Sequence, residues 1–164
     1  MPRDLITRLR QEAGLPTLSP MRSFAVPAMS SSQIAIVSRF EAAERLRPQL
    51  EAKLHHLIHA GIYHRTIELK AGTRITGALI KKPTAVTISG DAEVWLGGKT
   101  VRITGYAVLP ASAHRKQVFT ALADTWVTMA FRTKARTVEA AEKEFTDDWA
   151  QLVKCDGTTV ITED

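Results

Sequence analysis

The sequence predicts a mainly β protein whose central part folds into a sandwich or jelly-roll barrel, with helical segments on both sides of it in the chain. Roughly eight short stretches between Tyr63 and Phe131 alternate polar and apolar residues, as strands do. Turn residues separate these stretches every several positions, which is typical of sandwiches and jelly rolls. Outside this region the apolar residues recur with the period of a helix.

The predicted strands follow one another through the central region. In the first, Tyr63, Arg65 and Ile67 alternate with polar neighbours, so these three side chains share one face of a sheet. Gly97-Gly98 is a strong two-residue hairpin signal, and Gly90-Asp91 predicts another turn. The remaining strands are expected over 73–80, 85–89, 92–96, 99–103, 106–109, 117–120 and 125–131.

The flanking residues have a different composition. Prolines and serines recur through 1–31, which predicts an extended arm because proline fixes φ and lacks an N–H donor. Ser32 is expected to cap a helix from about residue 33, and a second helix is expected over 49–59. Thr137 is expected to cap an amphipathic C-terminal helix. The predicted units are an arm (1–31), a helical segment (32–60), a barrel (61–132), a C-terminal helix (133–154) and a polar tail (155–164).

Charge is distributed unevenly along the chain. Residues 1–136 carry a net charge of +11 and residues 137–164 a net charge of −6, within the total of +5. A basic body of this kind can bind nucleic acid. The alternative is that the acidic C-terminal segment docks on its own basic body or on a neighbouring copy. Aromatic and basic residues are not interleaved along the chain, so the sequence does not favour the binding of single-stranded nucleic acid.

Composition limits the class of protein further. The chain has 164 residues, of which 45% are hydrophobic, which suits one domain with extensions. The single cysteine, Cys155, excludes an intramolecular disulfide. No apolar run approaches the roughly 20 residues of a membrane span, and the N-terminus lacks a signal-peptide core. We therefore expect no membrane partner, and a cytoplasmic location as the default.

The stretch from His56 to Gly72, followed by Ile75-Thr76-Gly77, resembles the start of small cupin-like proteins of tailed bacteriophages. The resemblance spans about residues 50–150 and implies a single cupin-like jelly-roll barrel. Such proteins share a Gly-x-Tyr-x-Arg strand, a Gly-Thr turn, a central Ser/Gly turn and a late strand with Asp, Thr and Trp. The matching segments are Gly61-Ile-Tyr63-His-Arg65, Gly72-Thr73, Ser89-Gly90 and Asp124-Thr125-Trp126.

Cupin barrels bind a metal ion through histidines and a carboxylate, ligands that suit Zn, Fe, Mn or Ni. Where the family pattern would place these ligands, the chain has Ile80, Thr84 and Arg115. The resemblance therefore implies a barrel without a metal or another cofactor. His55 and His59 are weak candidate ligands, because residues four apart share one face of a helix. The alternative is a helix end where histidines interact with the C-terminal dipole.

Basic residues on the predicted strands suggest a binding site instead. Several arginines that converged at the barrel mouth could hold an anion such as a sugar phosphate or a nucleotide. The alternative for Arg65 is an ion pair with Glu68, Glu93 or Asp124. A metal-independent acid–base enzyme would use His64 with Tyr106, His114 and Asp124. The candidate ligand-binding residues are Arg65, Tyr106, His114, Arg115 and Asp124.

The first functional hypothesis is a non-enzymatic phage protein that acts as a structural module in a virion or another assembly. Its arm and C-terminal helix would contact other copies or other phage structural proteins, in the virion or the host cytoplasm. It predicts that the purified protein is oligomeric or binds a phage protein through residues 1–31. The alternatives are a binder of a small anionic ligand, a metal-independent sugar-nucleotide-type enzyme, and a protein that binds nucleic acid or interferes with host defence.

Overall fold

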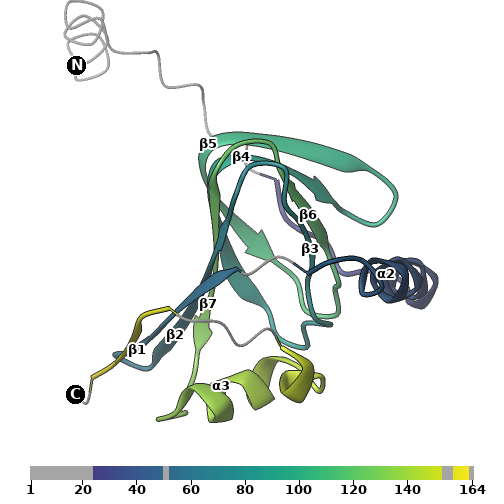
Figure 1. The fold of residues 1–164 in the computed structure, drawn as a ribbon. Coiled ribbons are helices and arrows are strands. Elements are labelled where there is room, and N and C mark those ends of the chain that lie inside the picture. The colour runs from purple at the N-terminus through teal and green to yellow at the C-terminus, as the bar shows by residue number, and fades with distance from the viewer. Residues whose placement is uncertain (1–23, 50–51, 153–156, 163–164) are drawn as a thin grey trace, which may run out of the picture.

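A computed structural model of the chain describes residues 24–49, 52–152 and 157–162. The prediction of a mainly β fold is confirmed, because eight strands form one curled, mostly antiparallel sheet with helices outside it (Figure 1). The elements are α2 (Ser31–Glu44), β1 (Lys53–His59), β2 (Ile62–Leu69), β3 (Arg74–Thr76), β4 (Thr84–Trp95), β5 (Thr100–Ala111), β6 (Val118–Ala121), β7 (Thr125–Arg132), α3 (Val138–Phe145), the 3₁₀ turn η1 (Trp149–Gln151) and β8 (Thr159–Ile161).

The sheet is organised around β4. The strands follow the order β3-β6-β4-β7-β2-β1-β8, and β5 pairs with the other side of β4. The whole of β4 pairs with β5, whereas its first half pairs with β7 and its second half with β6. Three strands therefore meet along one strand, and this arrangement curls the sheet into a half-barrel (Figure 1).

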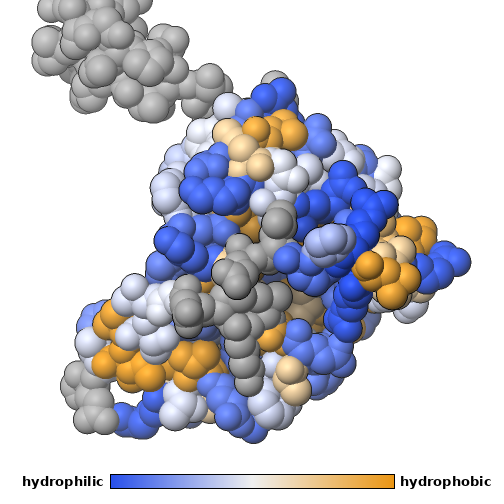
Figure 2. All heavy atoms as spheres, in the orientation of Figure 1, coloured by the Kyte–Doolittle hydropathy of each residue, from blue (hydrophilic) through white to orange (hydrophobic). Residues whose placement is uncertain are grey.

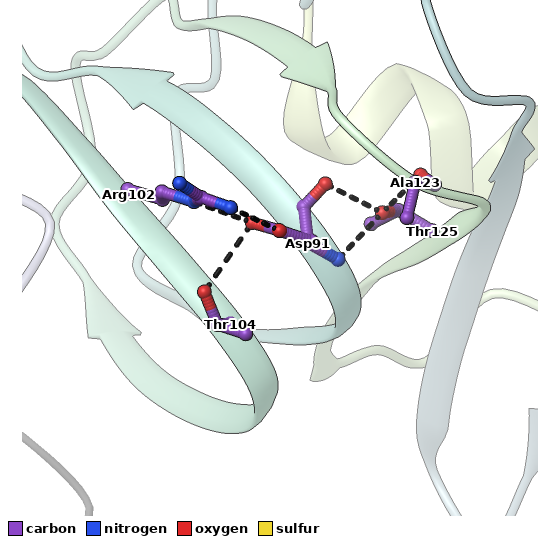
Figure 3. A network of polar contacts seen from close by, with 5 residues as sticks. All are labelled: Asp91, Arg102, Thr104, Ala123 and Thr125. Carbon is purple, nitrogen blue, oxygen red and sulfur yellow. Dashed lines mark hydrogen bonds and ion pairs between the residues drawn. The ribbon is translucent and has the colours of Figure 1, made fainter.

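Gly90 lies where β4 changes partner from β7 to β6. Its φ is +142°, and a Cβ atom on it would lie 2.4 Å from Thr125 Oγ1 and 2.6 Å from the Asp124 carbonyl oxygen. The Asp91 N–H donates to Thr125 Oγ1 (3.1 Å), and that hydroxyl also lies 2.8 Å from the Ala123 carbonyl oxygen (Figure 3). The start of β7 thus fits against β4 only because Gly90 has no side chain.

The Asp91 carboxylate continues this network onto β5. It accepts two hydrogen bonds from Arg102, at 2.9 and 2.6 Å, and one from Thr104 at 3.3 Å (Figure 3). The hydrogen bonds from Arg102 lower the pKa of Asp91. Gly90-Asp91 was predicted to be a turn, and that prediction is wrong: the pair is a point inside one continuous strand.

Two hydrophobic clusters fill the concave side of the sheet. The larger includes Val86, Ile88, Val94 and Leu109, and the smaller joins Tyr63, Phe131 and Phe145. The alternation predicted for β2 is confirmed, because Tyr63, Arg65 and Ile67 all face this side. Apolar residues alternate with polar ones along β4, so one face of the strand is buried and the other is not.

Helix α3 lies across the lower end of the sheet (Figure 1). Thr137 caps it as predicted, since the Thr137 hydroxyl accepts from the Ala140 N–H. Phe145 stacks near Tyr63 with ring centroids 6.4 Å apart. Three ion pairs join this acidic segment to the basic strands and the loop before β4: Arg65–Glu142, Lys82–Glu144 and Lys81–Asp147. The acidic segment therefore docks on its own basic body.

The residues before β1 form the other flank. Helix α2 begins two residues earlier than predicted, because Ser30 is its N-cap and forms a reciprocal capping box with Gln33. Val37 is its fully buried residue. Val26 pairs with Ala111 at the end of β5, so residues 24–29 lie beside the sheet. The rest of the predicted arm, 1–23, lies outside the described residues.

The helix predicted over 49–59 is wrong. Lys53–His59 is strand β1, which pairs antiparallel with β2, so that Leu54 lies opposite Ile67 and Ile58 opposite Tyr63. Leu54 and Ile58 lie four positions apart, and each also has a buried or half-buried residue two positions away. This spacing fits a helix and a strand equally well. Pairing with β2 decides in favour of the strand.

The C-terminal part also differs from the prediction. The helix is shorter than 133–154, because α3 ends at Phe145 and a separate 3₁₀ turn follows at Trp149–Gln151. The predicted polar tail contains strand β8, which pairs parallel with β1 through partners such as Leu57 and Val160. The predicted strands 85–89 and 92–96 are one strand, β4, and 99–103 and 106–109 are one strand, β5.

Exposed hydrophobic side chains form groups at several places on the surface. Figure 2 shows one group at lower left, over the end formed by β1, β2 and β8, and another at right, at α2. The first includes Ile62, Val160 and Ile161, and the second includes Ile36. In the described part of the chain, no helix has both the length and the apolar composition needed to cross a membrane.

Candidate functional site

A cavity of about 120 Å³ lies on the concave side of the sheet, between the two hydrophobic clusters. Its walls come from β2, β3, β4, β7, the segment before β6, and the α3–η1 region. Most of the lining is apolar, and the polar side chains among it are Arg65, Arg115 and Gln117. The apolar lining residues are Ile67, Ile75, Gly77, Ala78, Ile80, Val86, Phe119, Val127, Met129, Phe145 and Leu152.

Arg115 is the most unusual of these residues, because it is only 1% exposed and makes no ion pair with any residue that the structure describes. One terminal nitrogen, Nη1, donates to the carbonyl oxygens of Lys82 and Ser112, and Nη2 donates to Thr84 Oγ1 at 2.7 Å. Its Nε is buried and has no partner. Burial lowers the pKa of Arg115 to about 10, so the side chain is still cationic at neutral pH.

Gln117 lies two residues further along the same segment and is 5% exposed. Its backbone carbonyl accepts from the Gly77 N–H at 2.8 Å, which holds this segment against the strand region after β3. The side-chain Nε2 is buried without a hydrogen-bond partner. Leaving a buried N–H donor without an acceptor costs about 1–3 kcal/mol, so both Arg115 and Gln117 favour an acceptor in the cavity.

Arg65 is the second cation of the cavity, and it is paired. Its side chain is 10% exposed and makes a short ion pair with Glu142 of α3, whose side chain is 5% exposed. The prediction that Arg65 shares one face of the sheet with Tyr63 and Ile67 is confirmed. An ion pair was the alternative expected for Arg65, but Glu142 was not among the partners named for it. Only the folding of α3 across the sheet brings this glutamate to β2.

Next to Arg65, a polar pair of a half-buried histidine and a fully buried tyrosine links β1 and β2. His56 Nδ1 lies 2.8 Å from the Tyr63 hydroxyl. Burial, with smaller contributions from the charges of Arg65 and His55, lowers the pKa of His56 from 6.5 to about 4. Burial also raises the pKa of Tyr63 to about 12. Both groups are therefore neutral at neutral pH.

Stability is expected to fall as the pH drops from 6.5 toward 4. In this window the unfolded chain protonates His56 while the folded chain, with its lowered pKa of about 4, does not. The cost of keeping His56 unprotonated in the folded chain is absent above pH 6.5, and it grows progressively as the pH falls below that value. Because the site is half-buried, we expect a loss on the order of 1–2 kcal/mol.

Urea unfolding across this pH window measures the effect. The His56→Gln variant is expected to show a smaller pH slope than the wild type, and His114→Gln, which removes an exposed imidazole, controls for the loss of one histidine. An unchanged slope in His56→Gln would show that another group is responsible.

The other candidate residues lie away from the cavity. Tyr106 is 65% exposed on the outer face of β5. Asp124 is exposed and pairs with Lys70 at 2.6 Å. His114 is exposed in the turn before Arg115, with a positive φ of 61°. Of the five predicted ligand-binding residues, the structure brings together Arg65 and Arg115. His64, on the outer face of β2, does not join the other acid–base candidates either.

The histidines predicted as weak metal candidates lie on a strand. Residues four apart on a strand are about 13 Å apart along it, so His55 and His59 cannot share a metal ion. His55 Nε2 lies 2.7 Å from Glu68, and His59 Nδ1 lies 2.6 Å from the Thr162 hydroxyl. Across the described ranges, no three His, Cys, Asp or Glu side chains lie close enough to hold a metal ion together.

The three positions that replace the expected cupin ligands do come together. Ile80 pairs with Arg115 as an isolated bridge, and Thr84 accepts the hydrogen bond from Arg115. Gln117 was missed, because an isolated neutral polar residue beside a short apolar run gives no signal of its own.

These observations define a mainly β protein with a curled half-barrel sheet and a cationic cavity. No protein-family model matches the chain, and no curated protein sequence matches it. Solved structures to which it is similar include a cupin superfamily protein from Desulfitobacterium hafniense, with 12% identity and a TM-score of 0.43 over 55% of this chain and 86% of that one.

Two further similar structures are ectoine synthase from P. lautus and the EutQ protein of Clostridium difficile. The first has 19% identity and a TM-score of 0.44, over 60% of this chain and 76% of that one. The second has 11% identity and a TM-score of 0.43, over 56% of this chain and 69% of that one. Similarity at this level concerns the shape of the sheet and indicates nothing about ligand or activity.

Proposed function

We propose that this chain is a small-ligand-binding protein whose cavity takes an anion. The observation that carries the proposal is Arg115, a cation that is 1% exposed and has no carboxylate partner. A buried charge without a counter-charge is strongly unfavourable, so a protein that keeps one has a use for it. Beside it, Gln117 also lines the cavity, and its buried Nε2 has no hydrogen-bond partner among the described residues.

An alternative explanation is that Arg115 only holds the loops around it together. Its bonds to the Lys82 and Ser112 carbonyls and to Thr84 do serve that purpose. They use Nη1 and part of Nη2 and leave Nε without an acceptor. A neutral glutamine could donate two such hydrogen bonds without burying a charge. The charge itself therefore supports a role in binding.

The test is thermal unfolding of the full chain in the presence of acetate, benzoate or inorganic phosphate. Sodium chloride at the same ionic strength is the reference. At least one of the three anions is expected to raise the Tm above that reference, and the rise is expected to shrink in Gln117→Met, which removes the donor while keeping the side-chain volume. If no anion raises the Tm beyond chloride, the proposal is wrong.

A structural role in a phage particle or another assembly stays a prediction from the sequence. The exposed apolar residues Ile62, Val160 and Ile161 at the β1–β8 end are compatible with a contact to another chain. Helix α3 packs on its own sheet, so it offers a neighbour only its outer, charged face. Light scattering of the purified protein separates the cases, and a monomer at all concentrations would count against an assembly role.

A further inference from the structure

The charges on the cavity wall narrow the class of anion that can bind there. Arg65 and Arg115 are the cations among the lining residues. Arg65 is neutralised by Glu142, whereas Arg115 makes no ion pair. The described wall therefore carries one uncompensated positive charge. A ligand with a single negative charge balances it, whereas a dianion leaves a net charge in an apolar cavity.

The unpaired groups around this charge are all donors. Arg115 Nε and Gln117 Nε2 have no partner, and both residues line the cavity. Nη2 carries two hydrogens, of which one satisfies Thr84. Nε and Nη2 share one edge of the guanidinium, and two parallel N–H groups on that edge match the two oxygens of a carboxylate. The ligand group at this position must accept hydrogen bonds and need not donate any.

The rest of the wall is hydrocarbon. Ile75, Val86 and Val127 belong to it, together with the Phe119 ring and the flexible Met129. The cavity volume of about 120 Å³ is small. An apolar protein cavity of about 150 Å³ holds benzene, so this one suits a body of a few carbon atoms. Sugar phosphates and nucleotides exceed this volume and bring hydroxyl groups that the wall cannot pair.

We propose that the ligand is a small monocarboxylate, with its carboxylate between Arg115 and Gln117 and its hydrocarbon body against Ile75, Val86 and Val127. This rests on the proposed function and makes it specific. It replaces the sugar phosphate or nucleotide expected from the sequence. Burial of the hydrocarbon body supplies the favourable free energy, and the carboxylate relieves two unpaired donors and one unpaired charge.

Titration calorimetry on the full chain tests the class of ligand. The probes are isovalerate and butyrate as monocarboxylates, succinate as a dicarboxylate, inorganic phosphate, and isovaleramide as the uncharged analogue of isovalerate. We expect one monocarboxylate to bind at least about tenfold more tightly than succinate, phosphate and the amide, because tenfold corresponds to only about 1.4 kcal/mol.

The two proposals fail in different ways. If phosphate or succinate binds as tightly as the monocarboxylates, the ligand class is wrong although the cavity still binds anions. If isovaleramide binds as tightly as isovalerate, the charge of Arg115 is not used and the class is again wrong. If none of the five probes binds, both this inference and the proposed function are overturned.

Variants of the wall separate binding from folding. Gln117→Met is expected to weaken the monocarboxylate at least about tenfold, since it removes one donor at constant volume. Met129→Ala enlarges the apolar end and is expected to shift preference from isovalerate toward the longer hexanoate. A residue with only a structural role would not change the order of preference, so an unchanged order in a folded Met129→Ala protein contradicts the placement of the hydrocarbon body. His114→Gln, which is exposed beside the same segment, is the control.

Discussion

Replacing Gly90 with alanine is expected to lower the free energy of unfolding by more than about 3 kcal/mol. Two effects add. The φ of +142° is one that residues with a Cβ atom rarely adopt, and the new methyl group would lie 2.4–2.7 Å from atoms of Asp124 and Thr125. Two of the atoms it meets belong to the backbone, so no rotation of a side chain relieves the contact. The start of β7 would have to move away from β4.

The fold offers a matched control for this substitution. Gly105 is the register partner of Gly90 on β5, and its φ is also positive, at +84°. A Cβ atom on Gly105 meets nothing within 4 Å. Gly105→Ala is therefore expected to cost only the conformational strain, about 1–2 kcal/mol. Urea unfolding of both variants measures the difference. Equal losses would mean that the contact with Asp124 and Thr125 is unimportant.

Removing Glu142 is expected to cost about 3–5 kcal/mol, because it leaves the guanidinium of Arg65 nearly buried without a counter-charge. The side chains of the pair are 10% and 5% exposed. The substitution Glu142→Leu tests this. Glu139→Leu, on the exposed side of the same helix, is the control, and we expect a change of less than about 1 kcal/mol there.

The double variant Arg65→Met with Glu142→Leu distinguishes a charge effect from a packing effect. If the loss arises from the unpaired charge, the double variant is expected to recover most of the stability lost in Glu142→Leu. If instead the two losses add, the glutamate stabilises α3 through contacts other than the ion pair. Chemical denaturation of the wild type, the two single variants Arg65→Met and Glu142→Leu, and the double variant measures these losses.

Local patterns in the sequence were enough to predict much of the sheet. The alternation predicted from Tyr63 onward is confirmed, and it places Arg65 on the same side as Tyr63 and Ile67. The Gly97-Gly98 hairpin was also predicted correctly, because Leu96 and Lys99 close the loop between β4 and β5. These features depend on neighbouring residues alone, which is why the sequence shows them.

Features that depend on distant residues were missed. Strand β1 was predicted to be a helix; it pairs with its neighbour β2 across the short turn at Ala60-Gly61, and with the C-terminal β8, which lies far along the chain. A glycine with positive φ suits a turn and an interruption of a strand equally well, and only the contact of Gly90 with Thr125 decides between them. Single-residue patterns contain no information about partners so far along the chain.

The site was predicted in part for the same reason. Arg65 and Arg115 were candidate residues, and both line the cavity. Tyr106, His114 and Asp124 were chosen for their chemistry, and the fold places them elsewhere. Glu142 and Gln117 were not candidates, because a glutamate on an acidic helix and a glutamine in a short strand look ordinary. Their importance arises from burial, which the sequence does not show.

The strands at the margins of the sheet bear on how copies of this protein can meet. At the two ends of the strand order lie β3 and β8, three residues each, and they offer few unpaired backbone groups. The long marginal strand, β5, carries a positive-φ glycine at Gly105 and a proline at Pro110, where Val26 already pairs. Such edges resist the strand-to-strand joining that leads to aggregation. Copies that associate are therefore expected to contact each other through the faces of the sheet. Polymerisation by pairing of edge strands is disfavoured.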